Sequence, residues 1–153
     1  MASNPDIPIV EVSTFAHEDL KLHTKLGEAL APLRDQGVVI IGSGSAVHNL
    51  RYLRSHDPSI LPDYVVEFDK LLEKYATELK GDERKTKANT LDEHPYYRDC
   101  HPTAEHLVPF HTAAGAAGED TGIKLVEEYV STLSWSSYGF GLAADTKLPN
   151  YAS

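Results

Sequence analysis

The stretch "VVIIGSGSAVHNL", residues 38–50, carries the first group of side chains that could do chemistry. Four apolar residues give way to alternating glycine and serine, and the stretch then presents His48 beside Asn49. An imidazole titrates near neutral pH and can accept and return a proton. His48 is therefore a candidate acid/base, and a structural or surface histidine is the alternative. Glycine lets a backbone approach a ligand closely and serine adds a small donor, so the candidate substrate-binding residues here are Gly42, Ser43, Gly44, Ser45 and Asn49.

This glycine-serine stretch does not match the nucleotide-binding loops. A dinucleotide fingerprint would need glycine where Val47 stands. A phosphate-binding loop would need Gly-Lys-Ser/Thr, which does not follow. The histidine is therefore the group that this loop is expected to serve.

A second group of side chains lies in "HPTAEHLVPFH", residues 101–111, with His101, Glu105, His106 and His111. Glu105 is a further candidate substrate-binding residue. On a helix, His101 and Glu105 would share a face. The spacing matches neither His-x-x-x-His nor His-Glu-x-x-His, so spacing alone indicates a metal only weakly. A polar helix start with Glu105 in its first turn explains the same pattern without chemistry.

The elements that must position these groups predict an α/β fold. Residues 7–13, "IPIVEVS", form a β-branched run typical of a strand. Residues 17–37 predict a helix with Leu22, Leu26, Leu30 and Leu33 on one face, followed by a second, wholly apolar strand from residue 38. Strand, helix and strand with short joints predict a βαβ unit in a largely parallel central sheet flanked by helices. The loop with His48 would then lie at the carboxyl end of a strand, where open α/β sheets place their sites.

The rest of the chain predicts further elements of the same single domain, residues 1–153. A helix is expected after Pro62, and the charged run 80–90 is expected to be exposed. Residues 103–118 begin as a helix, and 123–130 and 137–141 predict strands. The core is expected over about 7–141, with a disordered tail at 142–153. The remaining histidines are expected at the surface: His17, His23, His56 and His94.

Composition narrows the classes of function. The chain has 153 residues, 41% of them hydrophobic, and a net charge of −9, which argues against nucleic acid and anionic membrane as partners. No apolar run is long enough to span a membrane, and no secretory signal pattern is present, so we expect a cytoplasmic protein. The single cysteine, Cys100, fits a reducing compartment and rules out an internal disulfide.

Four segments, in this order, resemble the class III extradiol ring-cleavage dioxygenases. They are "PIVEVS", "LGEALAPLRDQGVVIIGSGSAVHNL", "HPTAEHLVPFHTAAGAAG" and "LSWSSYGF". The resemblance runs from about residue 7 to about residue 141 and is greatest to the DOPA-dioxygenase-like branch, which is related to the B-type catalytic domain of these enzymes. It covers the C-terminal half of that family only, which implies a truncated extradiol-dioxygenase-like domain.

The resemblance implies a reaction and roles for two histidines. Such enzymes open a catechol ring beside its hydroxyls with O₂ and a non-haem iron, and some members carry zinc. The histidine of "G-S-G-x-x-x-H-N-L", here His48, acts as the acid/base. The histidine of "P-x-x-E-H", here His106, is a metal ligand. The family's two further histidine ligands lie in "G-H-G-S-P"-like and "S-A-H-W"-like motifs, and neither occurs in this sequence.

Three hypotheses follow. In the first, the chain is a dioxygenase whose missing ligands come from a partner chain. In the second, it is a metal-independent lyase, isomerase or cyclase that acts on a phenolic or quinonoid compound, with His101 or His106 assisting His48. The third is a non-catalytic binding module or remnant. Because catalytic sites use about three protein ligands, we expect no tightly bound metal, and iron or zinc only if a partner completes the site. We also expect a small aromatic substrate and a homodimer or larger homo-oligomer, because a halved domain should expose apolar surface.

Overall fold

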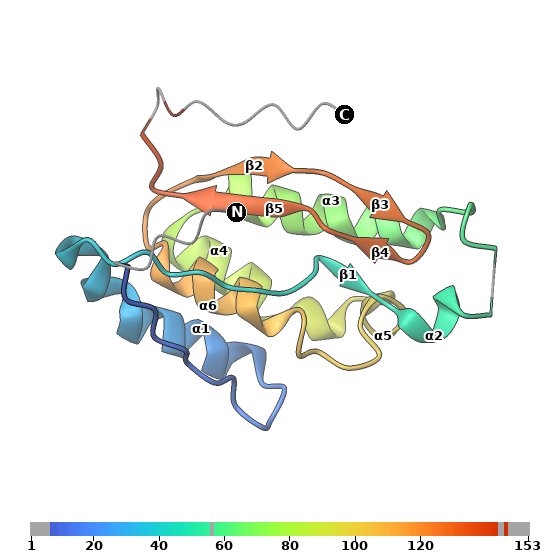
Figure 1. The fold of residues 1–153 in the computed structure, drawn as a ribbon, viewed down its shortest axis with the longest axis horizontal. Coiled ribbons are helices and arrows are strands. Elements are labelled where there is room, and N and C mark those ends of the chain that lie inside the picture. The colour runs from blue at the N-terminus through green and yellow to red at the C-terminus, as the bar shows by residue number, and fades with distance from the viewer. Residues whose placement is uncertain (1–6, 56, 144–145, 147–153) are drawn as a thin grey trace.

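The computed structural model describes residues 7–55, 57–143 and 146 of the chain. Helices pack against one side of two small sheets, with α3 behind the strands and α6 and α1 below them (Figure 1). The helices are α1 (Leu20–Leu30), α2 (Leu50–Leu53), α3 (Asp63–Thr77), α4 (Gly81–Ala88), α5 (Tyr97–Cys100) and α6 (Val108–Ala116), with 3-10 turns η1 (Ala31–Gln36) and η2 (Leu91–Glu93). The strands are β1 (Val47–His48), β2 (Gly122–Val126), β3 (Tyr129–Val130), β4 (Leu133–Ser134) and β5 (Ser137–Phe140).

The strands form two antiparallel sheets, in the orders β1-β4-β3 and β2-β5. The chain is thus a mixed α/β domain, but the largely parallel central sheet predicted from the sequence is not what the described residues form. The two runs predicted as its strands, 7–13 and 38–43, are largely exposed coil. Their β-branched side chains fit a pleated surface, yet a strand exists only where another edge pairs with its backbone groups.

The helix predicted after Pro62 is confirmed as α3. Its predicted apolar face is buried at Val65, Phe68 and Leu72, and Pro62 occupies its N-cap. Asp69 lies on the same buried face. The strands predicted at 123–130 and 137–141 are found as β2 with β3 and as β5, and the helix of 103–118 begins at Val108.

The helix predicted for 17–37 is present, but a different face is buried. It runs as α1 and tightens into the 3-10 turn η1 at Pro32. Thr24 and His23 face the core, whereas Leu22 is exposed. The expectation that His23 lies at the surface was therefore wrong. Its ring closes the first turn, because Nδ1 donates to the carbonyl of Asp19 at 2.7 Å and Nε2 accepts from the Phe15 amide at 3.2 Å.

Most of the charged run 80–90, which was expected to be an exposed loop or helix end, forms α4. Its charged side chains are exposed or half-buried, with one exception. Arg84 within it is fully buried. Its guanidinium donates to the carbonyls of Asp120 and Gly118, each at 2.6 Å, and lies 4.8 Å from the centre of the Phe140 ring. A buried cation is tolerated when it is hydrogen-bonded, and here it ties α4 to the turn after α6.

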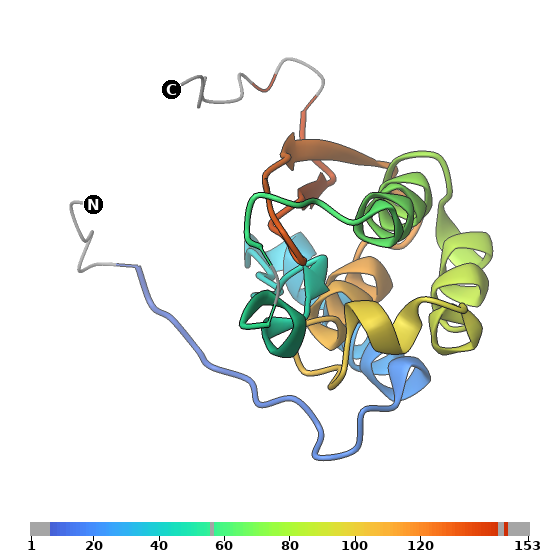
Figure 2. The same cartoon turned by 90° about the vertical axis from the view of Figure 1, so that its right-hand side faces the viewer.

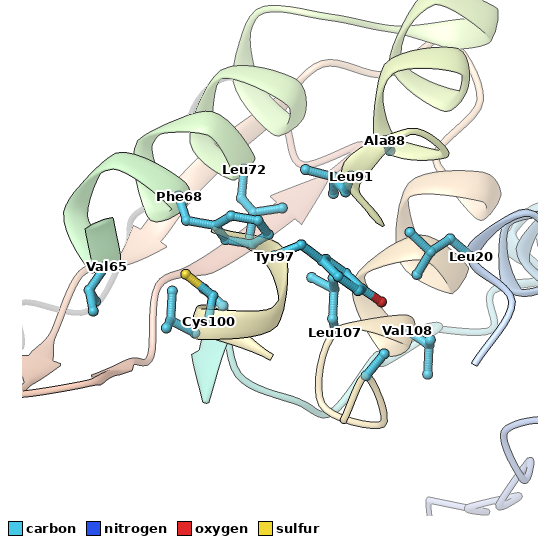
Figure 3. Close-up of a cluster of buried hydrophobic side chains, with 13 residues drawn as sticks. Leu20, Val65, Phe68, Leu72, Ala88, Leu91, Tyr97, Cys100, Leu107 and Val108 are labelled. Carbon is cyan, nitrogen blue, oxygen red and sulfur yellow. The ribbon is translucent and has the colours of Figure 1, made fainter. Parts of the chain in front are cut away.

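The hydrophobic core lies between α3, α5 and the start of α6 (Figure 3). Phe68 and Leu72 of α3 meet Tyr97 and Cys100 of α5 there, with Leu107 beside them. Cys100 is buried and free. Among the described residues, no helix has the length and apolar character required to cross a bilayer. Most of the tail predicted as disordered, residues 142–153, lies outside the described residues. His56 also lies outside them.

Candidate functional site

His48 lies in the short strand β1 rather than in a loop after a long strand. In β1, His48 pairs with Leu133 and Val47 pairs with Ser134, so β4 fixes the backbone on which the imidazole is carried. Asn49 follows directly and caps α2, because its side-chain oxygen accepts from the Tyr52 amide at 3.0 Å. The pairing of β1 with β4 and the helix cap at Asn49 together restrict the main chain at His48.

The segment before β1 lies directly on the turn that carries His106. The amide of Ser45 donates to the carbonyl of His106 at 3.0 Å. A Cβ atom at Gly44 would stand 2.1 Å from that same oxygen, and one at Gly42 would stand 2.3 Å from the carbonyl oxygen of Pro109. The two glycines are therefore required for close approach to the protein's own backbone, whereas the sequence suggested approach to a ligand.

This contact brings the two histidines of the predicted site together. The rings of His48 and His106 stack with centroids 3.8 Å apart and an interplanar angle of 11°. Burial, together with the neighbouring His106, lowers the pKa of His48 below its ordinary value. His48 is thus held neutral at neutral pH and can accept a proton.

Glu105 completes a cluster of three possible metal donors. Its carboxylate lies 3.1 Å from Nδ1 of His106, and the ligand atoms of His48, Glu105 and His106 lie within 4.8 Å of one another. Two imidazoles and one carboxylate are donors of the kind that non-haem iron uses. The orientation does not fit, because a metal must lie near the plane of each imidazole that binds it, and two stacked parallel planes share no such point. As placed, the two histidines cannot both hold one ion.

His101, the third histidine predicted to be catalytic, is enclosed beneath the site. It is fully buried, and its Nε2 donates to the carbonyl of Ala46 at 2.9 Å. Burial lowers the pKa of His101 to about 4, so the ring stays neutral. Its contact supports the main chain just before His48, which is a positioning role. His111 is separated from the others, because it is buried on α6 against Thr24.

A cavity of about 110 Å³ opens beside His106. Of the predicted binding residues, Gly42, Gly44 and Ser45 line it. Ser43 is exposed, Glu105 is exposed beside His106, and Asn49 is occupied by its cap and by a bond from Nδ2 to the Asp99 carbonyl at 2.6 Å. The aromatic and hydroxyl wall of this cavity was not predicted from the sequence. It is formed by Phe110, Ser136, Ser137, Tyr138 and Phe140.

Asp69, also not predicted from the sequence, holds Ser136 of that wall. Asp69 is fully buried and accepts from the hydroxyls of Tyr129 at 2.6 Å, Ser134 at 2.7 Å and Ser136 at 2.9 Å. One sequence signal was present: a carboxylate stands on the apolar face of α3, next to Phe68. Buried charges are rare unless they have partners, so a carboxylate at this position is expected to accept hydrogen bonds in the interior.

Comparison with known families gives one match over nearly the whole chain. Residues 1–143 match the family described as the catalytic LigB subunit of aromatic ring-opening dioxygenase. This is the kind of family that the sequence motifs resembled.

Individual relatives agree. A 4,5-DOPA dioxygenase extradiol of Beta vulgaris is 38% identical over 92% of this chain and 52% of its own length. One of Escherichia coli K12 is 32% identical over 76% of this chain and 42% of its own length. The crystal structure of an uncharacterized Escherichia coli K12 protein superposes with a TM-score of 0.67 at 30% identity, covering 78% of this chain and 49% of that one. The chain thus spans about half the length of the relatives that it matches.

Proposed function

Because the chain belongs to the family of the catalytic LigB subunit of aromatic ring-opening dioxygenases, we propose that it acts in extradiol opening of a catecholic or phenolic ring. In that reaction the carbon–carbon bond beside the hydroxyls breaks and both atoms of O₂ enter the product. The observation that carries the proposal is the stack of His48 on His106, which lines a cavity with aromatic walls.

In this proposal, separate residues of the chain bind the aromatic ring and transfer its proton. Phe110 and Tyr138 offer flat apolar surface for a single aromatic ring, and Ser136 adds a hydroxyl. A ring bound against His106 brings its hydroxyls to the histidine pair. His48, neutral at neutral pH, accepts the phenolic proton and returns it after ring opening.

A metal would be held by His106 with ligands that come from elsewhere. The hydrogen bond from Nδ1 of His106 to Glu105 fixes the tautomer and leaves Nε2 as the ligand atom. In this proposal, the chain alone turns over slowly when ferrous iron is added, and a partner polypeptide that supplies the remaining ligands raises that turnover.

The proposal is tested by turnover of a simple catechol such as 4-methylcatechol, followed by O₂ uptake and product absorbance. His48→Gln should lower turnover by about 10²- to 10⁴-fold, with little change in thermal unfolding. His106→Ala should also lower it, and His17→Gln, at an exposed histidine, serves as the control. A folded His48→Gln protein with undiminished turnover would contradict the role of His48. If the protein neither turns over nor binds catechol at millimolar concentration, the proposed function itself is contradicted.

A second candidate is favoured by the parallel rings, which suit proton transfer better than joint binding of an ion. A metal-independent lyase, isomerase or cyclase acting on a phenolic or quinonoid compound would use the same cavity. The same assay separates the two functions. Conversion without O₂ uptake that persists with a chelator identifies the second, whereas O₂-coupled ring opening identifies the first.

A further inference from the structure

The N-terminal arm, residues 7–13, is an extended apolar segment, and none of the described helices or strands packs on it. Its exposed fractions are 63% at Ile7, 91% at Ile9, 84% at Val10 and 52% at Val12. Figure 2 shows the arm running clear of the helices and sheets. Four aliphatic side chains in one short β-branched run make an exposed segment of the kind that pairs with other chains.

A strand groove, bounded by residues 38–42 and by β5, offers the complementary surface. The groove measures about 1170 Å³ and is lined on one side by Val38–Gly42 and on the other by Ser137–Phe140. Val39 and Ile41 within it are 80% and 81% exposed. Figure 1 shows residues 38–46 running below β5.

Both borders of the strand groove have unused backbone groups. Strand β5 pairs with β2 along one edge, and the described strands leave its other edge unpaired. In residues 38–45, only the amides of Val38 and Ser45 donate to a carbonyl of the described backbone. An extended segment entering the groove could therefore form backbone hydrogen bonds on either side.

We propose that the N-terminal arm of one copy of this chain adds as a strand in the strand groove of a second copy, with the exchange made reciprocally. The direction of the arm argues for a second copy. The Phe15 amide is bonded to His23 at 3.2 Å and its ring meets the His23 ring at 5.3 Å, so the arm is tied to the first turn of α1 and directed away from its own body.

The exposed aliphatic side chains supply a large part of the surface that a dimer needs. Burial of one valine or isoleucine side chain contributes roughly 1.5–3 kcal/mol. At about 25 cal/mol per Å², this corresponds to roughly 60–120 Å² of apolar surface. A reciprocal exchange covers the four aliphatic side chains of each arm and Val38, Val39 and Ile41 of each groove. Scaled by their exposed fractions, these side chains supply roughly 600–1,200 Å² of apolar surface, and the backbone of the two added strands supplies more. The total reaches the lower end of the roughly 1,200–2,000 Å² of stable interfaces. A two-fold exchange also closes on itself, so it ends at two copies.

The test is the mass of the full chain in solution, measured by sedimentation velocity. The wild type should sediment as a dimer, twice the 16.8 kDa chain mass. Val10→Lys in the arm and Val39→Lys in the groove should each weaken dimerisation at least tenfold, because each would bury a charge. Ile60→Lys, at an aliphatic side chain that is 58% exposed outside both surfaces, is the matched control and should leave the dimer intact.

Mixing the two variants tests the exchange itself. The Val10→Lys chain keeps its groove and the Val39→Lys chain keeps its arm, so an equimolar mixture should form a mixed dimer. Native mass spectrometry with one chain labelled with ¹⁵N detects it. Circular dichroism checks that each variant is folded, and Ile9→Glu with Ile41→Glu forms a second pair for the same comparison.

Three results would overturn the proposal. A monomeric wild type at tens of micromolar means that the arm docks on its own chain or not at all. A dimer that survives both substitutions uses another surface. A monomer that gains mass only when a different polypeptide is added shows that the groove receives that polypeptide.

Discussion

The imidazoles of His48 and His106 lie in nearly parallel planes, with ring centroids 3.8 Å apart. A histidine nitrogen directs its lone pair within the ring plane, so two stacked rings direct theirs along separate parallel planes. For both to bind one ion, one ring would have to rotate out of the stack. His106 and Glu105 alone offer fewer than the three ligands that catalytic metal sites use.

The isolated chain should therefore bind metal weakly. Metal analysis of the purified protein should find iron and zinc far below one equivalent per chain. Zinc titration against a chromogenic chelator should detect a weak site that His106→Ala removes and His17→Ala leaves unchanged. Near-stoichiometric metal in the purified protein would show that the chain completes a site by itself.

Gly44→Ala should destabilise the protein. The added Cβ would meet the carbonyl oxygen of His106 at 2.1 Å, and a backbone oxygen cannot turn aside as a flexible side chain can. Overpacking of this kind costs about 1–3 kcal/mol in the free energy of unfolding, which urea denaturation measures. Ser43→Ala, at the exposed neighbouring position, is the matched control. Equal stability of the two variants would mean that the segment does not rest on His106 as described.

The sequence predicted the elements whose contacts are local. Helix α3 was found because its apolar side chains recur at helical spacing, and β5 lies within the run 137–141 that was predicted as a strand. The failures were at positions governed by partners far away in the chain. Residues 38–41 are apolar enough for a buried strand, but no pairing edge stands beside them in the described part of the chain. Arg84 looked like one charge among many, and its burial depends on carbonyls after α6.

The candidate site followed the same division. His48 and His106 could be named from motifs, and the structure places their rings in contact. The cavity wall could not be named, because Phe110 and Tyr138 come from elements that only the tertiary fold brings together. Asp69 was the exception, since a carboxylate within an apolar helical face is a signal that sequence alone provides.

Asp69→Ala should lower both stability and the order of the cavity wall. It would leave the hydroxyls of Tyr129, Ser134 and Ser136 without their acceptor. Hydrogen bonds to a charged group contribute about 1.5–3 kcal/mol each, so the loss should be roughly 2–4 kcal/mol in the free energy of unfolding after partial rearrangement. Glu67→Gln, at an exposed carboxylate of the same helix, is the control. If Asp69→Ala costs no more than Glu67→Gln, the three hydroxyls find other acceptors.

Acid should destabilise the fold through two buried histidines. Burial lowers the pKa of His111 to about 3 and that of His101 to about 4, whereas a histidine in the unfolded chain titrates near 6.5. Between those values the unfolded chain binds protons that the native protein does not. The stability is therefore fully present above about pH 6.5 and is lost as the pH falls.

The loss should be visible as a slope. Each of the two histidines contributes up to about 1.4 kcal/mol per pH unit to the fall in the free energy of unfolding between about pH 6 and pH 4. His111→Asn keeps a polar atom near Thr24 but does not titrate, so its slope should be shallower by about one histidine's share. His17→Asn, at an exposed histidine, should keep the wild-type slope. Urea denaturation at a series of pH values measures all three, and equal slopes in wild type and His111→Asn would mean that His111 takes up its proton without unfolding.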